Sequence, residues 1–250
     1  MTSTWPIGLE ISAVPLRKVI RRSSAISNGT FRTYKHPDFE VTHIAGESPN
    51  ELLLLPFLEV DPNVKTILSQ PTVLHPELDG ASFTNTPDYA VHMGHAAAMV
   101  EVKGARQYAR LEIKLRLLAC ARYVEAAGYD YVVTTGADLR GSAIRHAVDD
   151  LWTFHRRTYT ALQLDSTLAM LRYCDMRVGD VVALLERALP GHQHVFTHVL
   201  SMAAGCRIFI DLDPKAEVGP DSIVRFPDPR AMPPILFPFR RPADDLEVAA

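Results

Sequence analysis

Apolar side chains recur at every second position in two neighbouring segments, residues 88–93 and residues 98–103. A period of two is typical of β-strands, because successive side chains of a strand point to opposite faces of its sheet. Gly94 and His95 lie between the two segments and suit a tight turn. The pattern therefore predicts two strands joined as a hairpin.

Two helices are predicted beside this hairpin. Over residues 107–127, leucines and other apolar residues recur at helical spacing, and Gly128 provides a helix end. An earlier helix begins at Ser48-Pro49-Asn50-Glu51, where serine is the cap, proline takes the first helical position and glutamate can close a capping box. This helix is expected to run to Val60. Short strands are predicted at residues 30–34, 64–69, 72–75 and 131–134, with a turn-rich stretch at 77–85.

The second half of the chain is mainly helical in its periodicity. Helices followed by a strand, a loop and another strand suggest a winged-helix module. The stretch from Pro227 is rich in proline and is expected to be a tail or a wrapping arm. The predicted helices are residues 142–157, 162–171, 178–189 and 195–204, and the strands are 207–212 and 223–226 around a loop at 213–222.

These elements predict an α/β fold in four parts. An arm (1–45) precedes a domain (46–136) in which helices flank one mixed central sheet. A mainly helical, winged-helix-like domain (137–226) and the tail (227–250) follow. A chain of 250 residues, 47% hydrophobic and 22% charged, has enough apolar surface for two modest globular domains.

Charge and cysteine content indicate which kinds of nucleic-acid contact, disulfide and metal site to expect. The formal net charge of -3 does not favour nucleic-acid binding by the whole chain, so DNA contacts need local basic patches, such as the arm between Arg17 and Lys35. Three widely separated cysteines indicate neither a disulfide framework nor a cysteine zinc site. Without a bilayer-spanning apolar run or a signal-peptide pattern, the chain is expected to be cytoplasmic and to have no membrane partner.

The predicted hairpin carries residues suited to catalysis. Asp88 follows Pro87 into the first strand, and Glu101 and Lys103 share one face of the second. Two carboxylates from adjacent strands are hard oxygen ligands suited to Mg²⁺, with Mn²⁺ expected to substitute, and the backbone carbonyl of Val102 can add a ligand. Lys103 can orient or help deprotonate an attacking water while countering phosphate charge. The pattern predicts metal-assisted phosphodiester hydrolysis.

Glu51 and Gln70 are further candidates for this site. Glu51 can serve a second metal or a metal-bound water, although helix capping alone also explains a glutamate at this position. Gln70 can hydrogen-bond near the cluster, although a glutamine before proline also suits a turn. If the site is real, the carboxylates of Glu51, Asp88 and Glu101 should converge within reach of one metal ion.

Charged residues just beyond the hairpin support weaker predictions. A second glutamate-x-lysine sequence, Glu112-Ile113-Lys114, falls in a helical segment, where positions two apart point to different sides. Arg106, Arg110 and Lys114 can grip the DNA backbone beside the site, or form a solvated helix face.

Three stretches around the candidate site resemble one known family. They are ESPNELLLLPFLEVDPNVKTILSQP from Glu47, TPDYAVHM from Thr86 and MVEVKG from Met99. A glutamate-bearing helix, D-P-x-V leading to Q-P, and then T-P-D and E-V-K strands look like the catalytic domain of TnsA, the endonuclease subunit of heteromeric cut-and-paste transposases. The similarity covers residues 47–104, with a less distinctive match to that family's winged-helix region over residues 178–189 and especially 206–212.

The resemblance implies properties that the residues alone do not. These are a restriction-endonuclease-like fold and Mg²⁺-dependent hydrolysis of one strand of double-stranded DNA at the 5′ ends of a transposon, with Glu51, Asp88, Glu101 and Lys103 as catalytic residues. The implied partners are a TnsB-like transposase and a TnsC-like ATPase. A restriction, repair or phage DNA-processing nuclease of the same fold is the first alternative, and a non-catalytic DNA-binding or scaffold subunit is the second.

Overall fold

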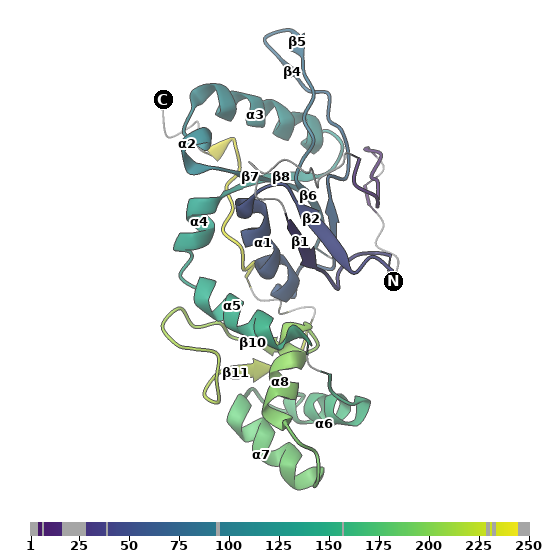
Figure 1. The fold of residues 1–250 in the computed structure, drawn as a ribbon, viewed down its shortest axis with the longest axis vertical. Coiled ribbons are helices and arrows are strands. Elements are labelled where there is room, and N and C mark those ends of the chain that lie inside the picture. The colour runs from purple at the N-terminus through teal and green to yellow at the C-terminus, as the bar shows by residue number, and fades with distance from the viewer. Residues whose placement is uncertain are drawn as a thin grey trace. The chain divides into compact units, whose positions relative to one another are not determined.

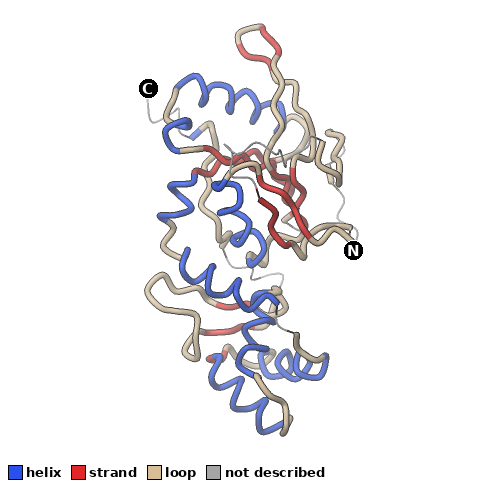
Figure 2. The backbone as a smooth tube through the Cα atoms, in the orientation of Figure 1, coloured by secondary structure: helices blue, strands red, loops and turns tan. Residues whose placement is uncertain are grey.

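The chain folds into two compact units, seen in a computed structural model that describes residues 5–6, 8–16, 29–38, 40–93, 96–156, 158–228, 231 and 234–244 (Figure 1). The first unit comprises the described residues up to Leu58, those of Asn63–Gly141 and those from Phe237 on. The second comprises Glu59–Pro62 and the described part of Ser142–Leu236. Figure 2 distinguishes the helices and strands of both.

A four-stranded mixed sheet forms the centre of the first unit. Its strands pair antiparallel except for the last two, which are parallel. The antiparallel pair β6–β7 confirms the two alternating strands, whereas the predicted turn residues Gly94 and His95 lie outside the described residues. The order is β3 (Thr66–Ser69), β6 (Tyr89–His92), β7 (Ala97–Lys103) and β8 (Asp130–Thr135).

The helices of the first unit begin and end close to the predicted positions, with one correction. The helix α1 (Pro49–Val60) starts at the predicted cap, where the backbone N–H of Glu51 donates to Ser48 Oγ at 3.2 Å. The single helix predicted at residues 107–127 is wrong, because extended backbone at Arg110 separates two helices. These are α2 (Ala105–Tyr108) and α3 (Leu111–Glu125), and α4 (Gly136–Gly141) follows β8 directly.

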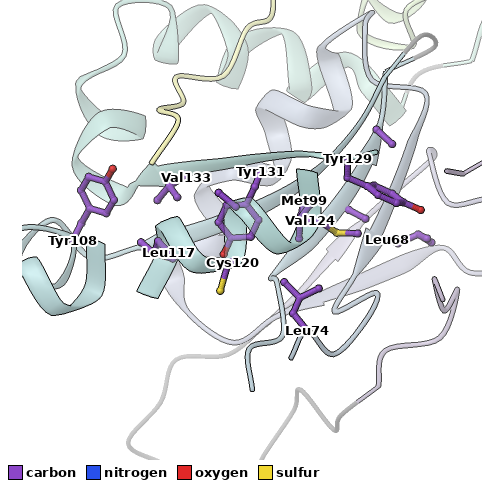
Figure 3. Packing of buried hydrophobic residues seen from close by; sticks show 13 residues of the cluster. Leu68, Leu74, Met99, Tyr108, Leu117, Cys120, Val124, Tyr129, Tyr131 and Val133 are labelled. Atoms are coloured by element: carbon purple, nitrogen blue, oxygen red, sulfur yellow. The ribbon is translucent and has the colours of Figure 1, made fainter. Parts of the chain in front are cut away.

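An apolar core packs α3 against one face of the sheet (Figure 3). The strand registers align Met99 of β7 with Ala90 on one side and with Tyr131 on the other. Both Met99 and Tyr131 belong to this core, with Leu117 and Val124 of α3. Because alternate residues of a strand share a face, Glu101 continues the core-facing row of β7 toward the end of that strand.

Short hairpins complete the first unit. One pairs β1 (Gly29–Arg32) with β2 (His43–Gly46), and the other pairs β4 (Glu77–Leu78) with β5 (Ala81–Ser82) inside the stretch predicted only as turn-rich. The β4–β5 hairpin extends away from the sheet (Figure 1). The strand predicted at residues 72–75 is wrong: only an isolated bridge joins Leu74 to Asn85. Pro71 and Pro76 flank this segment and have no N–H to donate to a ladder.

Part of the predicted tail pairs with the first unit. The backbone of Arg240 exchanges hydrogen bonds of 2.8 and 2.9 Å with Val133 of β8. Its guanidinium also forms an ion pair with Asp138 at 2.7 Å. The described residues from Phe237 on therefore belong to the unit that carries the sheet, and Arg240 bridges to β8, the strand next to β7.

The second unit is mainly helical, and most of its helices match the predicted ranges. The helix predicted at residues 142–157 is shorter than expected, and the strand β9 (Met176–Arg177) was not predicted. A capping box between Thr160 and Gln163 starts α6. The helices are α5 (Arg145–Thr153), η1 (Phe154–Arg156), α6 (Ala161–Leu171), α7 (Val178–Ala188) and α8 (Val195–Ala204), and β9 joins an antiparallel sheet in the order β10 (Phe209–Ile210), β11 (Ile223–Arg225), β9.

The described residues thus form a mixed α/β structure, which confirms the predicted fold class at that level. Its central sheet is mixed and accompanied by helices, as expected. Across the described ranges, none of the helices combines the length and apolar character needed to cross a membrane.

Candidate active site

A cavity of about 760 Å³ lies beside the start of β6, the end of β7 and the start of α1. The four predicted catalytic residues line it together with Val102. Glu51 and Asp88 are each 7% exposed and Glu101 is 2% exposed, so bulk water screens their charges poorly. The other lining residues are Glu47, Ser48, Asn50, Val73, Thr84, Asn85, Thr86, Gly104 and Gln107.

Strand register brings Asp88 and Glu101 together. Tyr89 pairs with Val100 in the antiparallel β6–β7 ladder, so Asp88 and Glu101 occupy the next opposed positions. Asp88 Oδ2 accepts a hydrogen bond from the backbone N–H of Val102 at 2.7 Å, which ties the carboxylate to β7. Both carboxylates reach the same cavity, as the alternation of the two strands predicted.

Glu101 is held by three polar side chains. Lys103 Nζ forms an ion pair with Glu101 Oε1. The other oxygen, Oε2, accepts hydrogen bonds from the Tyr131 hydroxyl at 3.2 Å and from Asn85 Nδ2 at 3.3 Å. Sequence reasoning missed Tyr131 and Asn85, because their proximity to Glu101 depends on how β8 and the β5–β6 connection pack against β7.

Glu51 combines helix capping with a place in the cavity. Its backbone N–H donates to Ser48 Oγ, and its carboxylate Oε2 accepts a 2.8 Å hydrogen bond from the backbone N–H of Glu47. The second of these contacts orients the Glu51 side chain at the start of α1. The carboxylate thus binds the backbone one residue before the cap Ser48, instead of Ser48 N–H as the predicted capping box requires, and it also lines the cavity.

Burial, assisted by neighbouring acidic groups, raises the pKa values of Asp88 and Glu51 in the cavity. Burial, followed by the charges of Glu101 and Glu51, raises the pKa of Asp88 well above its usual range. Burial also raises the pKa of Glu51, against the hydrogen bonds from Glu47 and Ser48 that favour its ionised form. Burial and neighbouring negative charges therefore disfavour the ionised forms of Asp88 and Glu51.

Lys103 responds in the opposite direction to the same charges. Burial lowers its pKa, but attraction to the carboxylates of Glu101 and Asp88 outweighs burial, so its pKa is raised overall. Lys103 is therefore an ammonium group at neutral pH. Among the lining residues it is the one cation, against the acidic side chains Glu47, Glu51, Asp88 and Glu101.

The donor set fits a hard divalent cation, although not in the arrangement expected from sequence. Among the residues that the structure describes, no group of three or more His, Cys, Asp or Glu side chains is arranged to hold a metal ion. The predicted convergence of Glu51, Asp88 and Glu101 is therefore wrong for this arrangement, in which each carboxylate turns one oxygen to a protein donor. Two carboxylates with a backbone carbonyl and an uncompensated negative charge remain suited to Mg²⁺.

Gln70 lies beside the site without lining the cavity. Its backbone N–H donates to the carbonyl of Asp88 at 2.9 Å, and its φ of 48° is in the left-handed region. The side chain is 2% exposed, and within the described part of the chain its amide has no hydrogen-bond partner. The predicted hydrogen bond from Gln70 to the cluster is thus absent from this arrangement.

The three predicted DNA-contacting residues lie outside the cavity lining. Arg106 is exposed on α2, and Arg110 is exposed and ion-paired with Glu112 at 2.9 Å. Lys114 Nζ lies over the ring of Tyr108, 5.5 Å from its centroid. Contacts of these residues with DNA remain a prediction.

Replacing Gly136 with alanine is expected to displace Asn50, one of the residues that line the cavity. A Cβ at this position would overlap the side-chain amide of Asn50, which lies beside Glu51 and accepts a 3.1 Å hydrogen bond from Arg140. The overlap should lower the free energy of unfolding by about 1–3 kcal/mol. Denaturant titration of Gly136→Ala beside Gly141→Ala, where a Cβ meets nothing within 4 Å, measures this. Equal stability of the two variants would contradict the packing described for Asn50.

The chain has no match among models of known protein families or among curated proteins. The resemblance to TnsA therefore depends on the quoted motifs alone. Any function assigned to the chain has to explain a cavity with buried carboxylates, one ammonium group and a polar lining.

Proposed function

We propose that the protein is a Mg²⁺-dependent DNA endonuclease whose first unit is restriction-endonuclease-like. One observation carries the proposal: Asp88, Glu101 and Lys103 line one cavity, with both carboxylates buried. A buried acidic pair next to an ammonium group is suited to holding a divalent cation beside a phosphodiester. The winged-helix interpretation of the second unit is a further part of the proposal.

Each residue has a distinct role in the proposed hydrolysis. Asp88 and Glu101 would hold Mg²⁺ with the carbonyl of Val102, and the bound cation supplies charge neutralisation and a more acidic water. Lys103, which keeps its proton, places positive charge where negative charge develops on the phosphate. Glu51 can accept a hydrogen bond from a water in the cavity, and its raised pKa brings it closer to the working pH of a proton acceptor.

The proposed substrate is double-stranded DNA at transposon ends, cut together with a TnsB-like transposase and a TnsC-like ATPase. The motif order over residues 47–104 supports this choice. Because the cavity lining is acidic and polar, most of the attraction to DNA phosphates has to come from basic residues outside it, of which Arg106 and Lys114 are candidates.

A nicking assay tests the proposal. The full-length chain, alone and with the partner subunits, is incubated with Mg²⁺ and supercoiled DNA that carries transposon ends. We expect nicking that EDTA abolishes and that Glu101→Ala slows by more than about 100-fold, because loss of groups that merely orient a metal ligand already costs about 10–100-fold.

The second glutamate-x-lysine sequence provides a matched control. Glu112 is 63% exposed on α3 and outside the cavity lining, so Glu112→Ala should nick at the wild-type rate. The proposal would be overturned if Glu101→Ala and wild type nicked DNA equally, or if no combination of partners gave cleavage. Mg²⁺-dependent cleavage of DNA without transposon ends would instead favour a restriction, repair or phage nuclease of the same fold.

A further inference from the structure

Each of the three buried acidic side chains in the cavity has at least one carboxylate oxygen engaged by a protein donor, and Glu101 has both engaged. The other oxygen of Glu101 contacts Lys103 Nζ, which also lines the cavity. The engaged oxygens and donors are Glu51 Oε2 with Glu47 N at 2.8 Å, Asp88 Oδ2 with Val102 N at 2.7 Å, and Glu101 Oε2 with Tyr131 Oη at 3.2 Å and Asn85 Nδ2 at 3.3 Å.

Glu101 differs from the other two because side chains supply its donors. Asn85 Nδ2 also lies 3.5 Å from the Tyr131 hydroxyl, so the three groups form a closed triangle. Tyr131 is 1% exposed within the apolar core under α3. The backbone of Asn85 is fixed by hydrogen bonds of 2.7 and 3.1 Å with Leu74. Both donors are therefore mounted on rigid parts of the unit and hold Glu101 Oε2 in one place.

With Oε2 held in this way, Glu101 can offer a cation only Oε1, for which the cation competes with Lys103 Nζ. Mg²⁺ takes six ligands in a nearly ideal octahedron and accepts carboxylates through single oxygens. Ca²⁺ is larger, takes about six to eight oxygens and often binds a carboxylate through both. Engagement of Glu101 Oε2 thus favours the smaller ion.

We propose that Tyr131 and Asn85 are positioning residues that make Glu101 a one-oxygen ligand and so select Mg²⁺ over Ca²⁺. This inference rests on the proposed function in one respect, that the cavity takes a divalent cation. Tyr131 and Asn85 would affect the cation only through their hydrogen bonds to Glu101. The selectivity can therefore be removed while Glu51, Asp88, Glu101 and Lys103 are all kept.

Cation binding without DNA measures the selectivity directly. Mg²⁺ and Ca²⁺ are titrated calorimetrically into full-length wild type, Tyr131→Phe, Asn85→Ala and the double variant at one pH. We expect each single variant to lose Mg²⁺ affinity by about tenfold. Ca²⁺ affinity should stay constant or rise, because the released oxygen lets Glu101 bind through both oxygens. The ratio of Mg²⁺ affinity to Ca²⁺ affinity should fall furthest in the double variant.

Tyr129→Phe is the matched control. The Tyr129 hydroxyl donates to the carbonyl of Pro6 at 2.8 Å, so this variant also loses one tyrosine hydrogen bond but leaves the donors of Glu101 intact. Its affinity ratio should equal that of wild type. Thermal denaturation confirms that every variant is folded at the temperature of the titration.

The outcomes separate this inference from the proposed function. An unchanged ratio in the double variant, or an equal loss of affinity for both ions, overturns the selectivity role, and so does a wild type that binds neither ion. The nicking assay on the same preparations gives a separate answer. Selective Mg²⁺ binding without cleavage of any DNA overturns the nuclease and leaves the role of Tyr131 and Asn85 standing.

Discussion

Asp88→Asn is expected to abolish DNA nicking and, without divalent cations, to stabilise the fold. Burial and the charges of Glu101 and Glu51 raise the pKa of Asp88 well above its usual range, so the ionised form is unfavourable in the folded protein. Asparagine removes the charge and keeps an oxygen for the N–H of Val102. We expect nicking to fall by more than about 100-fold and the free energy of unfolding to rise by about 0.5–2 kcal/mol.

The sign of the pH dependence follows from the direction of this pKa shift. Folded Asp88 binds its proton more tightly than unfolded Asp88 does. Its favourable contribution to stability is therefore complete below the unfolded pKa of about 3.9 and is lost as the pH rises through the folded pKa. Asparagine has no such dependence. The stability advantage of Asp88→Asn should accordingly grow with pH across this window, as thermal denaturation in EDTA at several pH values will show.

Asp138→Asn is a control for which we expect the opposite change in stability. Hydrogen bonding to Arg240, in particular, lowers the pKa of Asp138, so Asp138→Asn should destabilise the protein at neutral pH.

Added Mg²⁺ should raise the melting temperature of wild type and have no effect on Asp88→Asn, because a ligand stabilises only a protein that binds it. Loss of stability by Asp88→Asn in EDTA at neutral pH would contradict the unfavourable burial of this charge.

Local periodicity was sufficient to predict the residues that share the site. Glu101 and Lys103 are two residues apart on β7. Asp88 directly precedes β6, the strand that pairs with β7 in the hairpin. Their common location requires only strand alternation and a single antiparallel pairing. The place of Glu51 in the first turn of a helix capped by Ser48 was equally predictable. The entry of Glu51 into the cavity was not, because that depends on how α1 packs against the sheet.

The missed residues are those whose place depends on long-range packing. Tyr131 reaches Glu101 because β8 joins β7 in a parallel register, which aligns it with Met99, and no local pattern encodes that alignment. Asn85 lies in a turn-rich stretch whose path is set by the bridge to Leu74. The break at Arg110 was equally hidden, since the apolar spacing continues across the extended residue. A two-residue strand such as β9 is too short to show a period.

Lys103→Met is expected to slow DNA nicking by about 100–1,000-fold, the usual cost of removing a group that stabilises charge in the transition state. Burial lowers the pKa of Lys103, but the carboxylates of Glu101 and Asp88 raise it by more, so the side chain holds its proton throughout the neutral range. A protonated amine cannot accept the proton of the attacking water. In the absence of a bound cation, these charges favour charge stabilisation over deprotonation for this lysine.

Lys103→Arg separates the two roles, because arginine keeps the charge and cannot act as a base. Charge stabilisation predicts that Lys103→Arg retains more activity than Lys103→Met, and that the wild-type single-turnover rate has no rising limb from lysine deprotonation between about pH 6 and pH 9. Lys65→Met, at an exposed lysine of the same unit, controls for the loss of a lysine outside the cavity lining. An arginine variant as inactive as the methionine variant, together with a wild-type rate that rises with pH toward the lysine pKa, would instead assign Lys103 the role of base.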